Sequence, residues 1–138
     1  MVISLIDRSN YLRGLLILIR MDRKISEPEK EIMMRIGKVL DFNEEFCANA
    51  IQKILQNEHI ADEPPLFESR ELAKMFVLDG LTLGLCDHDA LHTREEEWLR
   101  SAVTKNKLEA AWFENQLGRA VKNRGSDLDL EAYHLEVD

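Results

Sequence analysis

The segment from residue 68 to residue 85 is apolar on nearly every side when it is wound as an α-helix. Its apolar members are Leu72, Met75, Phe76, Val77, Leu78, Leu81 and Leu83. A helix that is apolar all round has no face to give to water, so it runs through the centre of a bundle. We therefore expect an all-α fold in which the other helices surround this segment.

The rest of the chain places its apolar residues at steps of three and four, which is the helical period. This spacing predicts five further helices, near residues 5–19, 26–40, 43–55, 93–103 and 108–123. A break falls at 61–65, because the pair Pro64–Pro65 cannot lie inside a helix. No convincing strand is found, and 138 residues suit one domain. The sequence thus predicts a single-domain bundle of about six to seven helices.

The net charge of −8 is concentrated near the C-terminus. Residues 126–138 carry five acidic residues and no Lys or Arg, which predicts a solvated acidic tail that follows a helical domain over residues 1–125. A negative surface repels phosphate backbones and anionic lipids, so nucleic acid and membrane surfaces are disfavoured as partners. The longest apolar run, Gly14–Ile19, is too short to span a bilayer, and no signal peptide is recognisable. We expect a cytoplasmic protein with a protein partner, and the sequence leaves homo-oligomerisation open.

Two helix starts share one design. Ser26-Glu27-Pro28-Glu29 fits a capping box, in which the serine hydroxyl and the second glutamate each accept from a backbone amide. Thr93-Arg94-Glu95-Glu96 repeats the arrangement about 67 residues later. Each box follows an apolar helix and a short acidic turn, over 21–25 and 86–91. A helix–acidic turn–helix unit therefore occurs twice.

This unit resembles the TerB-like family, which is named for a bacterial tellurite-resistance protein and is related to a helical domain of some DnaJ-type co-chaperones. The family pattern places a Glu seven residues after the Asp of the turn, as Asp22 and Glu29 do here. In the second copy Asp87 and Glu95 are eight residues apart, and Asp89 to Glu96 restores seven. The glycine that follows the Asp in the family is replaced by Arg23 and by His88 or Ala90.

The resemblance covers about residues 5–122. It implies a bundle of about seven short helices whose acidic residues bind metal. It also implies a link to stress and tellurite resistance, without a settled enzymatic activity.

The acidic turns offer oxygen ligands of the kind that calcium and magnesium require. If the two copies pack as a pseudo-twofold pair, six carboxylates converge: Asp22, Glu29, Asp87, Asp89, Glu95 and Glu96. The alternative is that the glutamates complement helix N-termini and the aspartates stabilise turns, with no ion.

A second candidate metal site lies within residues 86–92. Cys86, His88 and His92 could bind zinc or another transition metal, with Asp87 or Asp89 completing the shell. The alternative is that Cys86 is a buried thiol at the end of an apolar helix and that His92 packs at the cap.

Asp79 is the polar exception in the apolar fourth helix, where an unpaired carboxylate is costly. We expect a partner such as Arg13 or Arg20 of the first helix. The alternative is that Asp79 joins Asp87 in a functional site.

The sequence contains no glycine-rich phosphate loop, nucleophile elbow or CxxC pair, and no cofactor other than a divalent cation is indicated. Trp98, Trp112 and Phe113 are interpreted as core or interface anchors. The first hypothesis is a non-catalytic, stress-response helical module that binds a divalent metal ion through its acidic turns. The alternative is a metal-free protein-interaction domain that uses Trp112 or the acidic tail. A metal-dependent enzyme built on Cys86–His92 is the third.

Overall fold

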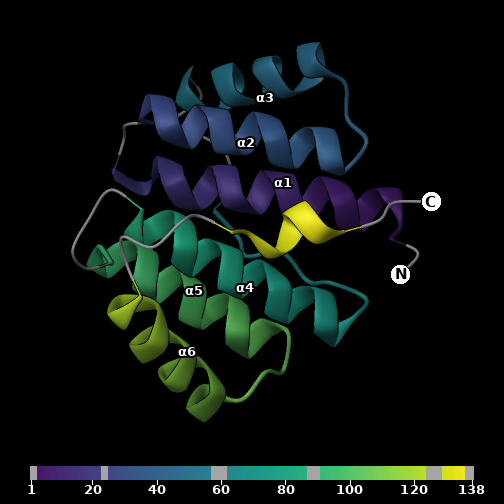
Figure 1. The fold of residues 1–138 in the computed structure, drawn as a ribbon. Coiled ribbons are helices and arrows are strands. Elements are labelled where there is room, and N and C mark those ends of the chain that lie inside the picture. The colour runs from purple at the N-terminus through teal and green to yellow at the C-terminus, as the bar shows by residue number, and fades with distance from the viewer. Residues whose placement is uncertain (1–2, 23–24, 57–61, 87–90, 124–128, 136–138) are drawn as a thin grey trace.

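The computed structural model describes residues 3–22, 25–56, 62–86, 91–123 and 129–135, and it confirms the predicted all-α bundle (Figure 1). Six α-helices make up the bundle: α1 (Leu5–Ile19), α2 (Glu27–Val39), α3 (Glu44–Gln56), α4 (Arg70–Leu85), α5 (Thr93–Lys105) and α6 (Ala110–Lys122). Two short 3₁₀ turns, η1 (Arg20–Asp22) and η2 (Glu131–His134), complete the described part. In that part no helix is long and apolar enough to cross a bilayer.

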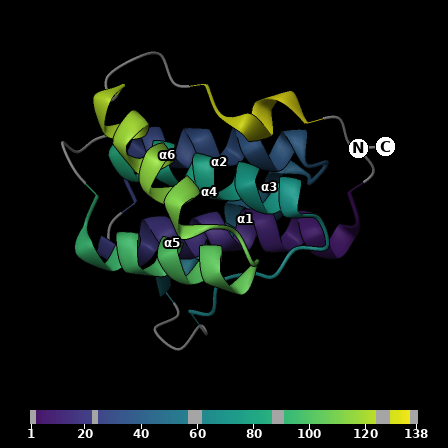
Figure 2. The ribbon, with the colours of Figure 1, turned by 90° about the horizontal axis from the view of Figure 1, so that it is seen from below.

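The apolar helix α4 lies at the centre, as its composition predicts. It packs against α1, α5, α6 and η2, and its side chains Leu72, Phe76 and Leu81 are fully buried. Helix α1 runs beside it, and two glycines allow the close approach. A Cβ on Gly14 of α1 would lie 2.7 Å from the ring of Phe76, and one on Gly80 of α4 would lie 3.1 Å from Leu18 of α1. The core is therefore built on the α1–α4 pair, with the other helices laid over it (Figure 2).

The predicted repeat is present and extends beyond the two helix starts. Helices α2 and α5 have 13 residues each and begin at Glu27 and Thr93, 66 positions apart. Helices α3 and α6 also have 13 residues each and begin at Glu44 and Ala110, again 66 positions apart. The chain thus consists of a first unit, α1–α3, and a second unit, α4–α6.

The turn between the second and third helix of each unit has the same backbone form. Asp41 and Lys107, also 66 positions apart, have positive φ angles of 68° and 58°. The next amide in each turn donates back to the helix at 2.9 Å, from Phe42 to the Gly37 carbonyl and from Leu108 to the Val103 carbonyl. Both helices therefore end with a residue in the left-handed conformation. The repeat is present in the structure as well as in the sequence.

The expectation of a solvated acidic tail is wrong for residues 129–135. The turn η2 packs against α4 and α2, and Leu130 and Ala132 are fully buried. The Arg35 guanidinium of α2 lies 3.9 Å from the centre of the Tyr133 ring. Acidic and apolar residues alternate here, so the carboxylates can stay exposed while the apolar side chains enter the core. The bundle therefore extends past residue 125, whereas 126–128 and 136–138 lie outside the described residues.

Candidate functional site

The first acidic helix start forms the predicted capping box. The Ser26 hydroxyl accepts from the Glu29 amide at 3.2 Å, and the Glu29 carboxylate accepts from the Ser26 amide at 2.9 Å. Glu29 is only 9% exposed. This carboxylate therefore has a structural partner at the N-terminus of α2.

The second box is shifted by one residue from the prediction, because His92 and not Thr93 is the N-cap of α5. The His92 Nδ1 atom accepts from the Arg94 amide at 3.2 Å, and Glu95 accepts from the His92 amide at 3.2 Å. Glu96 instead pairs with Arg100 at 3.2 Å on the helix surface. A helix that begins at Thr93 places Glu95 at its third position, and only that position reaches back to the cap.

The predicted metal ligands are described only in part. Asp87, His88 and Asp89 lie outside the described residues, and so does the side chain of Asp22. Cys86 is the half-buried C-cap of α4. Among the Asp, Glu, His and Cys residues that the structure describes, no three or more are grouped to hold an ion. The carboxylate site and the Cys86–His92 site therefore stay predictions.

Asp79 has different partners from those the sequence suggested. Its carboxylate accepts from the Tyr11 hydroxyl at 2.5 Å and from the Glu131 and Ala132 amides at 2.6 and 3.0 Å. The expected partners lie elsewhere, since Arg20 pairs with Asp62 and Arg13 is exposed.

Burial raises the pKa of Asp79 to about 6, although its three hydrogen bonds oppose the rise. Its own burial and the same carboxylate raise the pKa of Tyr11. The Asp79 carboxylate therefore holds η2 on the bundle, which is a structural role. The sequence does not reveal this role if residues 126–138 are interpreted as a solvated tail.

The two tryptophans have different environments. Trp98 is buried, and its indole N–H donates to the Asp62 carbonyl at 2.7 Å. Phe113 is also in the core, being 1% exposed. Trp112 is only half-buried and lies in a surface groove between α4 and α6. Of these predicted anchors, Trp112 is therefore the one available to a ligand.

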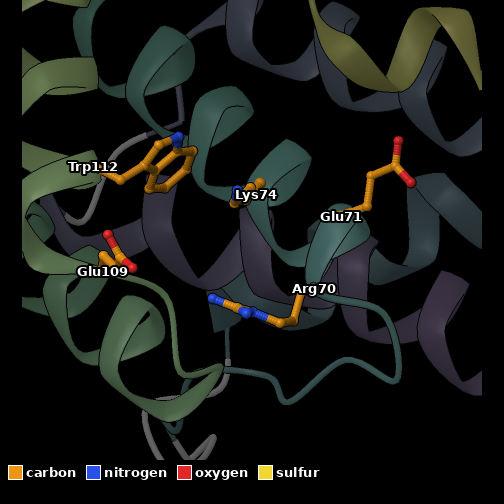
Figure 3. A pocket seen from close by; sticks show the side chains of 5 residues that line it. All are labelled: Arg70, Glu71, Lys74, Glu109 and Trp112. Atoms are coloured by element: carbon orange, nitrogen blue, oxygen red, sulfur yellow. The ribbon is translucent and has the colours of Figure 1, made fainter.

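The groove beside Trp112 encloses about 450 Å³ and is shown in Figure 3. Its lining residues are Arg70, Glu71, Lys74, Glu109 and Trp112. The Lys74 ammonium lies 5.6 Å from the centre of the indole ring, within the range of a cation–π contact. Glu71 points away from the other four side chains in Figure 3. The groove, which we call the Trp112 groove, thus combines an aromatic face with two cations and the carboxylates of Glu71 and Glu109.

Sequence reasoning missed four of the five groove residues. Arg70, Glu71 and Lys74 lie in the first two turns of α4, and Glu109 is the N-cap of α6. The spacing of Arg70 and Lys74 signals a basic strip on one side of the helix. That α6 brings Trp112 to this strip follows only from the packing of the second unit.

The chain matches no protein-family model, and neither curated proteins nor solved structures give a significant match. The TerB-like likeness therefore remains a resemblance in the two helix–turn–helix motifs.

Proposed function

We propose that this protein is a non-catalytic protein-binding module and that its Trp112 groove takes a partner segment in which a carboxylate lies next to an apolar side chain. The observation that carries the proposal is the half-exposed Trp112 ring, set beside two cationic side chains in an open groove.

The chemistry of the groove is that of a recognition surface. Trp and Arg dominate the energetic centres of protein interfaces, because they combine large contact area with directional polar contacts. The exposed Lys74 ammonium and Arg70 guanidinium can pair with a carboxylate, and the Arg70 guanidinium is already anchored by donating to the Lys107 carbonyl at 3.0 Å. The lining carries two cations and two carboxylates. Because Glu71 points away from the other four side chains in Figure 3, a ligand carboxylate can approach Lys74 and Arg70 beside the indole.

The acidic tail is the other interaction element that the sequence suggested. Its described part is packed on α2 and α4 through Leu130 and Ala132. Side chains buried in the molecule's own core do not reach a partner, so the Trp112 groove is the better supported binding element.

The stress-response role that the TerB-like resemblance implies is a separate proposal about metal. It depends on the carboxylates of the two acidic turns and helix starts, and calorimetric titration with calcium, magnesium and zinc tests it without reference to the groove. These residues are Asp22, Glu29, Asp87, Asp89, Glu95 and Glu96. If none of the three ions gives a heat of binding, the metal-binding part of that proposal is wrong.

The protein-binding proposal is tested with two labelled peptides of equal length, one with Leu and Glu residues and an uncharged control with Leu and Gln residues. Fluorescence anisotropy with the full chain should show binding of the acidic peptide. Trp112→Ala and Lys74→Ala should each weaken it by about tenfold, the loss typical of an interface anchor. Arg119→Ala, which removes an exposed cation of α6 outside the groove, is the matched control. Equal binding by wild type and Trp112→Ala would show that the groove is not the site.

A further inference from the structure

The repeat places a second exposed aromatic residue at the position that Trp112 occupies. Phe46 is 66 positions before Trp112, and each is the third residue of the last helix of its unit. Phe46 is 48% exposed. Arg8 is likewise 66 positions before Lys74, and its guanidinium lies 5.9 Å from the centre of the Phe42 ring, on which Phe46 stacks. Each unit therefore presents an aromatic ring near a basic residue of its first helix.

The surface around Phe46 is more apolar than the Trp112 groove. Leu5 and Ile6, in the first turn of α1, are 59% and 70% exposed. Arg8, one turn further along α1, reaches the α2–α3 turn by donating to the Leu40 carbonyl at 3.1 Å. Helices α1 and α3 begin at the same end of the bundle (Figure 1), and Arg8 joins the two by lying over Phe42. Leu5 is three residues before Arg8 and shares its side of α1. We call Leu5, Phe42 and Phe46 the Phe46 surface.

The charges at the edge of the two equivalent surfaces differ. Asp41, Glu44 and Glu45 are exposed beside Phe46, and the residues 66 positions later are Lys107, Ala110 and Ala111. Glutamates at a helix start can serve the helix dipole alone. The helix dipole alone does not explain Glu44 and Glu45, because α6 begins at the equivalent position with two alanines and forms a helix of the same length.

We propose that the Phe46 surface docks a basic amphipathic helix of a partner protein. The apolar face of such a helix covers Phe46 and Leu5, and its Lys and Arg side chains pair with Asp41, Glu44 and Glu45. Exposed apolar side chains in one area mark interaction sites, and a rim of one charge selects a partner of the opposite charge. The basic charge of Arg8 does not cancel this rim, since its guanidinium is bonded to Leu40 and lies over Phe42.

The test uses the full chain and a labelled amphipathic Leu/Lys helix of about 18 residues, or five turns. We expect binding in an anisotropy titration that weakens with added salt. Phe46→Ala and Leu5→Ser should each reduce the affinity by about tenfold, and so should the double variant Glu44→Lys/Glu45→Lys. Leu5→Ser keeps the test valid if Phe46→Ala does not fold, as judged by circular dichroism.

Two matched controls separate this surface from a general charge effect and from the Trp112 groove. Glu31→Lys/Glu97→Lys makes the same change in net charge at exposed sites on α2 and α5, and it should leave the affinity unchanged. Trp112→Ala should also leave the affinity unchanged, because its side chain lies in the groove of the other unit.

Three results would overturn the proposal. One is no binding of the Leu/Lys helix, and another is an equal loss in the matched charge variant. The third is self-association of the wild type in sedimentation that Phe46→Ala and Trp112→Ala both abolish, because a second copy of this chain would then be the occupant.

Discussion

Asp79 makes the stability of this protein depend on pH in an unusual direction. Burial raises the pKa of its carboxyl in the folded chain to about 6, against 3.8 for an unperturbed aspartate. The folded chain therefore holds the proton more tightly than the unfolded chain. Since protonation favours the state that binds the proton better, this group raises the free energy of unfolding as the pH falls through 6 toward 4.

The size of the effect follows from the two pKa values. Between about pH 7 and about pH 4.5 the wild type should gain about 2 kcal/mol relative to a variant that cannot titrate at this position. Asp79→Asn is that variant. Every other carboxyl is common to both proteins, so their contributions cancel in the comparison.

The assay is urea denaturation of wild type and Asp79→Asn at both pH values. Tyr11→Phe is a third protein in the series, because it removes a hydrogen bond that lowers the pKa of Asp79 and should therefore enlarge the gain. The same pH dependence in wild type and Asp79→Asn would refute the reasoning. It would mean that the carboxyl is equally solvated in both states.

Three further predictions concern stability. Glu29→Ala and Glu95→Ala should each cost about 1 kcal/mol through loss of the cap, with and without a chelator; a loss seen only when metal is present would instead favour ion binding. Gly37→Ala should cost about 1–3 kcal/mol of stability in thermal unfolding, because the new methyl would lie 2.2 Å from the Cys47 sulfur. Cys47→Ala in the same chain should restore part of that stability, and no recovery would contradict this contact. Leu130→Ala should cost about 2–5 kcal/mol in denaturant unfolding, whereas a solvated tail would make it neutral.

Much of the fold is predictable because it depends on local patterns. The all-round apolar character of residues 68–85 places α4 at the centre. The Ser26 box follows from four consecutive residues. Both signals act within one or two turns of helix, where the sequence alone specifies the interaction.

The errors arise where the partner is distant in the sequence. Asp79 bonds to amides more than 50 positions away, and a backbone amide leaves no mark in the sequence. The prediction of a solvated tail fails for the same reason, since its acidic residues are visible and the packing around Leu130 is not. At the second cap the error is chemical: a neutral histidine nitrogen accepts as a serine hydroxyl does, and only the position of Glu95 distinguishes His92 from Thr93.

The candidate site is predictable only to the level of residue type. Trp98 and Trp112 both lie among apolar residues at helical spacing in the sequence. In the structure, however, Trp98 is in the core and Trp112 borders a groove. The difference lies in how α6 is placed over α4, which depends on contacts that no short motif encodes.

The 66-residue repeat gives this chain a freedom that a symmetric dimer lacks. In a homodimer, one gene supplies both partners, so a substitution that suits one binding face is imposed on the other as well. Here the two halves are joined covalently and share the α1–α4 core, while their equivalent faces can change independently. At equivalent positions of the two units, Asp41 corresponds to Lys107 and Glu44 corresponds to Ala110. These differences show that the two faces have diverged. Under the two binding proposals above, one scaffold holds two different partners on a single chain.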